Sequence, residues 1–416
     1  MLVYVLNKYG KPLMPCHPAK ARILLKQGKA KVVKRTPFTI QLLYGSSGYK
    51  QPVILGIDSG YTYVGLSAIT NKREVYAAEV ILRNDISKLL TERRQYRKFR
   101  RYRKTRYRKA RFLNRRKPKG WLPPSLQHKL DSHVKIVEQI KKILPITKIV
   151  IEVASFDIQK IKNPDISGKE YQNGEQTDFW NVREYVLYRD RHTCQACKGK
   201  SKDQVLQIHH IIPRSKGGTD RPDNLITLCR TCHKKLHDGK LKLKFNKIKN
   251  FKAETFMSTI RWKIVDKLKE AGFLVEITYG HITKQRRIQL RLSKNHINDA
   301  FIIAGGNRQI RNSVYYLIKQ VRKCNRKLFK GIRSHIRNTA ERFVFGFQRF
   351  DKVLWRRTEC FIWGRRKKGY FDLRKLDGAK IHASAKVGEL KLLERARTFL
   401  IEVHPYGNGS VARRVK

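Results

Sequence analysis

The chain has 416 residues, of which 94 are Lys or Arg and 32 are Asp or Glu, so its formal net charge is +62. Because 40% of the residues are hydrophobic, which is enough to build buried cores, the composition excludes a disordered basic tail. It also disfavours a compact protein that faces only water, because so large an excess of like charge repels itself, and it favours a polyanionic partner. The length predicts about two to four domains.

The chain shows no long apolar run, which predicts that it has no membrane partner. No secretory leader is recognised, and the seven cysteines fit reduced thiols better than disulfides. These features predict a cytoplasmic protein of a prokaryotic cell, associated with the nucleoid through its charge.

The first 50 residues are predicted to form a small separate domain. Short strands are expected at VYVLN, KVVKR and FTIQLLY, and a basic helix at PAKARILLKQGKA. The segment KPLMP is predicted to be a turn, and GSSG at residues 45–48 a linker.

Residues 53–82 predict three strands in a meander. The first strand, PVILGIDSG, is a nearly continuous apolar run, as is typical of a buried central strand, and Asp58 stands at its end. Further along, residues 125–144 predict an amphipathic helix that leads to the strand KIVIEVA, which carries Glu152.

Residues 93–119 predict one long basic helix, with Lys or Arg at most positions and Tyr and Phe between them. So many like charges at i, i+4 spacing destabilise a helix in water, so a polyanion is expected to neutralise them. Arginine dominates, and its guanidinium suits bidentate contacts with phosphate. The candidate nucleic-acid-binding residues are Arg93, Arg94, Arg97, Arg100, Arg101, Arg103, Arg106, Arg108, Arg111, Arg115 and Arg116.

Between residues 194 and 237 the chain holds two CxxC pairs: Cys194 with Cys197, and Cys229 with Cys232. Four thiolates at this spacing can close a tetrahedron around a structural Zn²⁺ ion. Because such a site has no open position, its expected role is architectural.

Histidines lie inside and just after this segment. His209 and His210 are adjacent, so in an extended strand they point in opposite directions, and one can bind metal while the other faces a substrate. His233 and His237 are four residues apart and share one face of a helix, which suits two metal ligands. Asn224, in the intervening loop, can orient a neighbouring backbone or histidine.

This segment resembles the HNH nuclease family, which has the ββα-metal fold. The resemblance implies that His210 is the general base that activates water, and that His209 and His233 bind one divalent cation, with His237 as a further ligand. Asn224 would be the central Asn, which is structural more than chemical. Many relatives carry Asp where this chain has His209. Mg²⁺ is the default expectation, but Mn²⁺, Ni²⁺ and Zn²⁺ stay open.

After a helix expected over residues 252–272 and the strand FLVEITYG, the segment NHINDAFIIAGG predicts a short helix that carries His296 and Asp299 one turn apart. Taken singly, an Asp at a strand end is usually a turn residue. Carboxylates that a sheet and a helix bring together are the ligands that two Mg²⁺ ions need for phosphodiester hydrolysis. The pattern resembles the RuvC subset of the ribonuclease H-like fold, which implies metal binding by Asp58, Glu152 and Asp299. His296 would activate water or position the phosphate.

The order of these motifs, together with KPLMP, resembles the IscB family of transposon-encoded RNA-guided (OMEGA) nucleases. The fold class implied is α/β and multidomain, a split RuvC domain with an inserted HNH domain. The implied segments are an N-terminal PLMP domain at 1–50, RuvC part I at 51–92, an arginine-rich bridge helix at 93–120, RuvC part II at 121–165, the HNH domain with its structural zinc at 170–248, RuvC part III at 249–306 and a β-rich C-terminal domain at 307–416. In the last segment, RFVFGFQRF, ECFIWGRR and GYFDLRKLDG read as β-like.

The resemblance implies an RNA-guided DNA endonuclease that makes a double-strand break. HNH would cut the guide-paired strand and RuvC the displaced strand, while the bridge helix reads the backbone of the guide–target duplex. The implied partners are a guide (omega) RNA and double-stranded DNA with an adjacent motif, which the C-terminal domain contacts, and the protein is expected to be monomeric in its ribonucleoprotein. Two alternatives stay open: a protein-guided HNH/RuvC-type nuclease, homing or junction-resolving, and a nucleic-acid-binding protein without catalysis.

Overall fold

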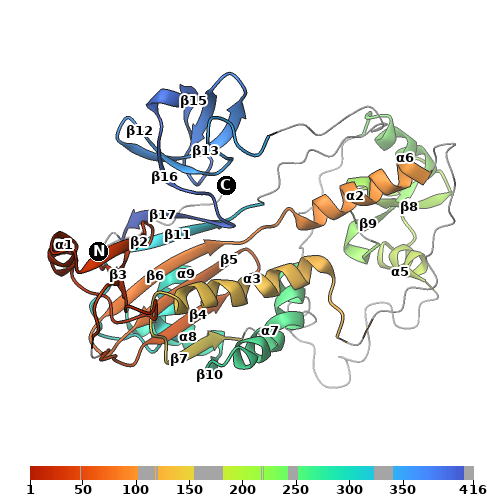
Figure 1. Ribbon diagram of the computed structural model, residues 1–416. Helices are drawn as coiled ribbons and strands as arrows, with labels where there is room; N and C mark the ends of the chain where they lie inside the picture. Colours follow the sequence, from red (N-terminus) through yellow and green to blue (C-terminus); the bar gives the residue numbers. More distant parts are fainter. Residues whose placement is uncertain are drawn as a thin grey trace. The chain divides into compact units, whose positions relative to one another are not determined.

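The computed structural model describes residues 1–46, 48–101, 118, 120–153, 181–216, 218, 220–241, 252–322 and 341–406. The chain folds as two compact units, one made of Met1–Ser155 with Phe256–Lys416 and the other of Phe156–Thr255 (Figure 1). The second unit therefore interrupts the first in sequence. Together the two units make a mixed α/β multidomain protein.

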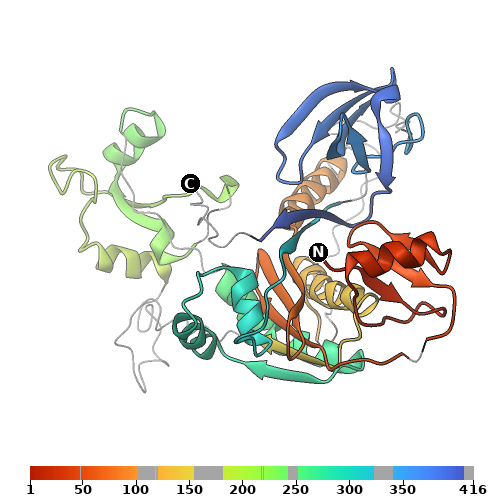
Figure 2. The ribbon, with the colours of Figure 1, turned by 90° about the vertical axis from the view of Figure 1, so that its left-hand side faces the viewer.

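The first unit begins with a small three-stranded sheet in the order β1-β3-β2, over which α1 lies (Figure 2). Its elements are β1 (Tyr4–Leu6), α1 (Pro18–Lys26), β2 (Ala30–Lys34) and β3 (Thr39–Leu42). The helix begins after His17, whose Nδ1 accepts a hydrogen bond from the backbone N–H of Ala19. A proline at the first helical position costs no hydrogen bond, so the helix starts where the sequence predicts.

A seven-stranded sheet follows, in the order β10-β7-β4-β5-β6-β11-β17. The strands are β4 (Ile54–Ser59), β5 (Tyr63–Ile69), β6 (Glu74–Ile81), β7 (Lys148–Glu152), β10 (Val275–Thr278), β11 (Val314–Gln320) and β17 (Phe399–Pro405). The first three form the expected antiparallel meander, and β7 and β10 run parallel to β4. Because parallel neighbours end at the same edge of a sheet, the carboxyl ends of β4 and β7 meet there.

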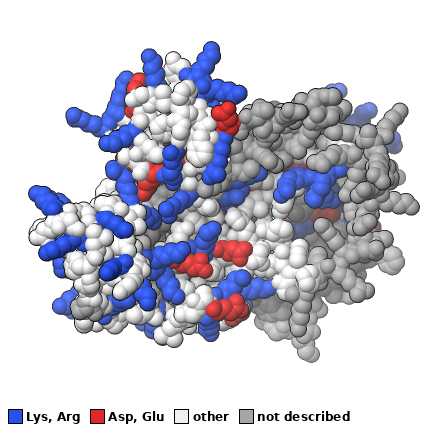
Figure 3. Space-filling model, in the orientation of Figure 1, with Lys and Arg blue, Asp and Glu red and all other residues white. Residues whose placement is uncertain are grey.

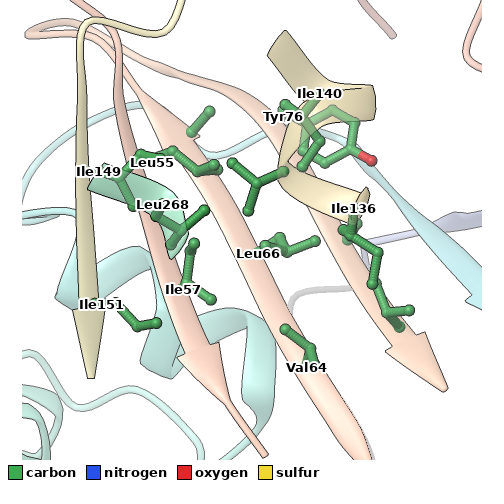
Figure 4. Close-up of a cluster of buried hydrophobic side chains, with 14 of the residues drawn as sticks. Leu55, Ile57, Val64, Leu66, Tyr76, Ile136, Ile140, Ile149, Ile151 and Leu268 are labelled. Carbon is green, nitrogen blue, oxygen red and sulfur yellow. The ribbon is translucent and has the colours of Figure 1, made fainter. Parts of the chain in front are cut away.

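Helices bury apolar side chains against both faces of this sheet. On one face, α3 (Pro124–Lys141) and α7 (Lys252–Glu270) pack with the strands, and Figure 4 shows Ile136 of α3 beside Leu66 of β5. Each fully buried Leu or Ile stabilises the fold by roughly 1.5–3 kcal/mol. Residues that alternate with these along β4 and β5 face the other way, toward α9 (His296–Ile303).

The last part of the first unit is a five-stranded antiparallel sheet in the order β15-β14-β13-β12-β16. Its strands are β12 (Lys352–Trp355), β13 (Thr358–Arg366), β14 (Tyr370–Arg374), β15 (Lys380–Lys386) and β16 (Lys391–Glu394). One predicted β-like stretch is wrong, because residues 342–350 contain no strand but a tight turn closed by a single β-bridge between Val344 and Phe347. Phe345 and Gly346 have φ of 47° and 77°, and such left-handed backbone cannot continue a strand.

The helices also differ from the prediction in two places. α2 (Ile86–Arg101) begins before the predicted start at residue 93, and residues 102–117 of the predicted bridge helix lie outside the described part of the chain. α8 (Gly280–Gln289) was not predicted, because its sequence GHITKQRRIQ carries a weak apolar pattern. Within the described residues, no helix combines the length and apolar character that crossing a membrane requires.

In the second unit, β8 (Leu206–His210) and β9 (Leu225–Cys229) form an antiparallel pair between α5 (Val182–Arg189) and α6 (Arg230–His237). Short 3-10 turns lie at Arg214–Lys216 and Pro222–Asn224. The Arg189 guanidinium donates to the carbonyls of Pro222 and Leu225, which ties α5 to the start of β9. This ββα arrangement places the four cysteines and the histidines in one small unit.

Candidate metal centres

Asp58 and Glu152 lie at the same edge of the seven-stranded sheet. Asp58 is near the end of β4 and Glu152 ends β7, and the register pairs their predecessors Ile57 and Ile151. The hydroxyl of Ser59 donates to the Glu152 carbonyl at 2.9 Å, which fixes the two strand ends against each other. The structure thus brings together two of the predicted carboxylates from positions far apart in sequence.

Two glycines let α9 approach this edge closely. A Cβ on Gly65, which pairs with Asp58 across the sheet, would lie 1.9 Å from the His296 carbonyl oxygen. A Cβ on Gly56 would lie 2.0 Å from the Ala300 carbonyl oxygen. Any side chain at either position would push the helix away. The helix can therefore carry its polar residues to the carboxylates only because these positions have no side chain.

His296 is held directly against Asp58. Its Nδ1 lies 2.7 Å from Asp58 Oδ2, and its ring stacks on Tyr63 at a centroid distance of 5.4 Å. The hydrogen bond with Asp58 raises the pKa of His296, while burial acts in the opposite direction. This contact leaves Nε2 as the ring nitrogen that can serve water or a phosphate oxygen.

Asp299 lies one helical turn further along α9 and faces Arg287 of α8, whose Nε is 3.0 Å from Asp299 Oδ1. These two buried atoms form an ion pair, yet neither has a hydrogen-bond partner in good geometry among the described residues. Burial raises the pKa of Asp299, and the negative charge of Asp58 raises it further. A buried carboxylate oxygen without a hydrogen bond is suited to a cation.

The carboxylates of Asp58 and Asp299 also affect the pKa of Glu152. The pKa of Glu152 is raised to about 6, because burial and the charges of Asp58 and Asp299 raise it more than the hydrogen bond from Thr283 lowers it. Three carboxylates at one sheet edge supply the hard oxygen ligands that divalent cations such as Mg²⁺ prefer. The structure places all four predicted residues of this centre together, whereas Arg287, Thr283 and Tyr63 were not predicted.

The second unit brings three imidazoles together. Ligand nitrogens of His209, His233 and His237 all lie within 4.8 Å of one another. His233 Nε2 is 3.1 Å from His209 Nδ1 and 3.2 Å from His237 Nε2. Burial, together with the two neighbouring imidazoles, lowers the pKa of His209 to about 4, so this ring is neutral at pH 7. Neutral imidazole is the form that binds metal, and the three rings fit one divalent cation.

His210 belongs to a separate contact. Its Nε2 lies 2.9 Å from Asp220 Oδ1, a carboxylate that Arg214 also contacts. The hydrogen bonds from Arg214 and His210 lower the pKa of Asp220. Asp220 was not predicted, because a loop aspartate beside glycines reads as a turn residue. The pair Asp220–His210 has the arrangement of an oriented base, since the carboxylate fixes the ring and leaves Nδ1 for a proton.

Asn224 holds the loop that follows His210. Its side chain is 2% exposed; its Oδ1 accepts from the Ile212 N–H at 2.9 Å and its Nδ2 donates to the Ile212 carbonyl at 3.0 Å. A Cβ on Gly218 would lie 1.7 Å from that same carbonyl. The Asn224 amide therefore bonds both of its polar atoms to the backbone of this loop.

The four predicted zinc ligands form a compact cluster. The sulfur atoms of Cys194, Cys197, Cys229 and Cys232 all lie within 4.8 Å of one another. Cys229 is also the N-cap of α6, where its Sγ accepts from the Cys232 N–H at 3.4 Å. Four thiolates at these separations fit a closed Zn²⁺ site. His233 follows Cys232 directly, so the cluster would fix the helix that carries His233 and His237.

Part of the predicted nucleic-acid surface lies in α2. Arg93, Arg94 and Arg97 are on the described part of that helix, whose backbone also includes Arg100 and Arg101. The remaining predicted arginines, Arg103, Arg106, Arg108, Arg111, Arg115 and Arg116, lie outside the described residues.

Comparison with known proteins gives two family matches. A model described as HNH endonuclease matches residues 194–239, which hold the cysteine and histidine clusters. The chain contains an HNH endonuclease domain. A second model, described as RRXRR protein, matches residues 3–174. An RRXRR region followed by an HNH domain fits an IscB-type nuclease, as the sequence predicts.

Individual relatives match over short stretches. The type IV methyl-directed restriction enzyme EcoKMcrA of Escherichia coli (strain K12) is 36% identical over 66 residues, which is 14% of this chain and 24% of that protein. A probable HNH endonuclease of Lactococcus phage SK1 is 37% identical over 60 residues, 13% of this chain and 63% of that protein. The chain thus spans less than two thirds of either relative. Among solved structures, Streptococcus thermophilus Cas9 in complex with the AGAA PAM aligns with 16% identity and a TM-score of 0.29, over 44% of this chain and 26% of that one.

Proposed function

We propose that this protein is an RNA-guided DNA endonuclease that makes a double-strand break, with the HNH domain cutting the guide-paired strand and the sheet centre cutting the displaced strand. The observation that carries the proposal is the presence of two separate candidate hydrolytic centres in one chain. One is the carboxylate group of the seven-stranded sheet, and the other is the histidine group of the inserted unit. A double-strand break needs two cuts, and two centres can supply one each.

The order of elements supports a split RuvC domain. Asp58 lies on the first strand of the seven-stranded sheet in chain order, Glu152 on the fourth, and Asp299 on a late helix. The insert enters between the strand of Glu152 and the helices that precede Asp299. This is the arrangement that the resemblance to RuvC implies.

In the sheet centre, Asp58, Glu152 and Asp299 would hold divalent metal ions, with Mg²⁺ as the expected species. Bound ions would polarise the phosphate and stabilise charge on the departing oxygen. His296 keeps a proton on Nδ1 toward Asp58 and presents Nε2 to water or to a phosphate oxygen. Tyr63 restricts the ring by stacking on it.

In the HNH centre, His209, His233 and His237 would hold one cation, and His210 would take the proton from the attacking water at Nδ1. Asp220 orients the His210 ring by its hydrogen bond to Nε2. Asn224 keeps the loop that contains Asp220 in register with β8. The cysteine cluster, with Zn²⁺ bound, would hold α6 in place.

Charge supports nucleic-acid partners. Lys and Arg side chains crowd the visible surface of the five-stranded and three-stranded sheets, with few Asp and Glu between them (Figure 3). At the tip of the β12–β13 hairpin, Arg356 and Arg357 have φ of 43° and 66°, a conformation that favours Gly or Asn. Two arginines kept in a strained turn suit contacts with phosphates or base edges, so we assign this hairpin to the nucleic-acid surface.

The test is cleavage by the full-length protein purified with its co-expressed RNA, on a matched duplex labelled separately on each strand. We expect both strands to be cut, Asp58→Ala to lose the displaced-strand cut alone, and His210→Ala to lose the guide-paired cut alone. Sequencing the co-purified RNA identifies the guide. If protein stripped of RNA cuts a defined sequence, the protein-guided alternative holds instead.

A further inference from the structure

Asn298 lies between His296 and Asp299 on α9, but its side chain does not join the carboxylates. It is 4% exposed, and the turn of about 100° per residue directs it away from His296. Its Nδ2 donates to the Ser293 carbonyl at 2.9 Å, and its Oδ1 accepts from Arg311 at 3.1 Å and from the hydroxyl of Tyr406. The helix α9, which carries the site residues His296 and Asp299, is thus also held by the hydrogen bonds of Asn298.

Arg311 connects this helix with the sheet and with the C-terminal strand. Its three donor nitrogens reach different partners: Nε donates to Glu74 Oε2 at 2.8 Å, Nη1 to Asn298, and Nη2 to the Tyr406 hydroxyl at 2.8 Å. The guanidinium also lies 4.1 Å from the ring centroid of Phe301, on the same helix. A planar fork with fixed donor directions holds its partners at defined positions.

Glu74 anchors the network at the start of β6. Its side chain is fully buried, and its carboxylate accepts from the hydroxyl of Ser67 on β5, from Arg311 and from the Asn312 N–H. A buried carboxylate with every partner in place is stable, whereas removing one partner leaves an uncompensated charge. The Glu74 side chain therefore keeps a fixed position as long as Arg311 compensates its charge.

Tyr406 brings a distant part of the chain into the network. It follows β17, the strand that leads out of the five-stranded sheet after β16 and pairs with β11, and its N–H donates to the Ser313 carbonyl. The hydroxyl of Tyr406 therefore connects the segment that leaves the C-terminal sheet with α9.

We propose that Arg311 is a positioning residue for the sheet centre, and that Tyr406 makes the placement of His296 and Asp299 depend on β17. Within the described part of the chain, Arg311 and Tyr406 make no hydrogen bond or ion pair with Asp58, Glu152 or Asp299; they act through Asn298 and α9. The proposal rests on the proposed function, in that the sheet centre cuts the displaced strand.

The experiment compares Tyr406→Phe and Arg311→Lys with Tyr4→Phe in the full ribonucleoprotein. Tyr4→Phe is the matched control, because Tyr4 is also buried and its hydroxyl donates to the Val75 carbonyl at 3.0 Å, next to Glu74 but remote from α9 in this network. Single-turnover rates are measured for each strand, and amide hydrogen exchange is followed over residues 293–304.

We expect Tyr406→Phe and Arg311→Lys to slow displaced-strand cutting about 10- to 100-fold, the range typical of residues that orient metal ligands. The guide-paired cut should keep its rate, and α9 amides should exchange faster. Tyr4→Phe should leave both the displaced-strand rate and α9 exchange unchanged.

An unchanged displaced-strand rate in both network variants would overturn the proposal, as would equal slowing in Tyr4→Phe or equal slowing of both strands. The variant Asp58→Ala, measured in parallel, distinguishes failure of the positioning role from failure of the proposed function. If that variant still cuts the displaced strand, the proposed function of the centre fails. If it does not, while the network variants cut normally, the positioning role fails and the proposed function stands.

Discussion

Arg287 occupies the position of a counter-cation to Asp299, with 3.0 Å between its Nε and Asp299 Oδ1, although neither atom has a well-oriented hydrogen bond among the described residues. An ion pair whose atoms are not oriented for a hydrogen bond holds its two side chains together only weakly. The guanidinium thus offsets the negative charge of the cluster and competes with an incoming metal ion for the same carboxylate.

We expect Arg287→Gln to tighten divalent-cation binding at the sheet centre by about fivefold, since an interaction of about 1 kcal/mol with Asp299 is lost. Calorimetric titration with Mn²⁺ measures this directly, in a His233→Ala background that removes a ligand of the other centre. Arg286→Gln, an exposed neighbour on the same helix, is the control and should bind as the parent does. Equal or weaker binding by Arg287→Gln would contradict a competing cation.

A second prediction concerns the pH dependence of the metal-free protein. The pKa of Glu152 is raised to about 6 from about 4.5. A carboxyl with a raised folded-state pKa contributes stability that is present below its unfolded pKa and is lost as pH rises through the folded value. We therefore expect the protein in chelator to lose about 1.5 kcal/mol of stability between pH 4.5 and pH 6.5 through this residue.

Thermal melting over that window, with and without Mg²⁺, checks the sign. Mg²⁺ should raise the melting temperature more at pH 6.5 than at pH 4.5, because the bound ion offsets the repulsion among the carboxylates. Glu152→Gln should flatten this difference. The raised pKa of His296 beside Asp58 also makes stability fall as pH rises, but at a higher pH. Measuring only between pH 4.5 and pH 6.5 therefore separates the contribution of Glu152 from that of His296. A Mg²⁺ effect independent of pH in the parent protein would count against the assignment.

The close approach of α9 gives a third prediction. Gly65→Ala would place a methyl group 1.9 Å from the His296 carbonyl, so the helix must move. We expect a loss of about 1–3 kcal/mol in stability, and displaced-strand cutting should fall much more than guide-paired cutting. Gly388→Ala meets nothing within 4 Å and serves as the control. If Gly65→Ala cuts both strands at the parent rate, the helix does not need this contact.

The site residues that the sequence predicts share one property: each stands at a recognisable point of a local pattern. Asp58 and Glu152 end apolar runs, and His296 and Asp299 are one helical turn apart. The residues that the sequence does not predict, such as Arg287, contact partners on other elements of the fold. Arg287 lies on a helix with a weak apolar stripe, and nothing in the local sequence tells which of 94 basic residues will face a carboxylate. Such partnerships come from the packing of distant segments.

The same reasoning explains the other differences. The helix that holds Arg93 begins at Ile86, because ISKLLTE continues the helical pattern before the charge run that attracts attention. Asp220 was missed because its loop position reads as a turn, and its contact with His210 depends on the fold of that loop. Strand alternation correctly separated His209 from His210, since that prediction needs only the local backbone.

The cysteine cluster gives a fourth prediction. Cys194→Ser should remove the bound Zn²⁺ and destabilise the second unit, because three thiolates cannot close the tetrahedron. Metal analysis of the purified protein should fall by one zinc per chain, and hydrogen exchange should rise in α6. Cys16→Ser, in the N-terminal domain, is the control and should keep its zinc. Unchanged zinc in Cys194→Ser would mean that the cluster does not hold it.

The last prediction concerns metal preference in the HNH centre. Three imidazoles form a softer ligand set than carboxylates, so we expect the guide-paired cut to reach half its maximal rate at a lower concentration of Mn²⁺ than of Mg²⁺. His209→Asp replaces one imidazole by a hard oxygen ligand, which Mg²⁺ prefers, and should lower the Mg²⁺ requirement of that cut about 10-fold, which corresponds to ~1.4 kcal/mol of binding. The displaced-strand cut, which depends on carboxylates, provides the internal control and should keep its Mg²⁺ dependence. A parallel change in both cuts would indicate that His209 does not bind the ion that serves the guide-paired strand.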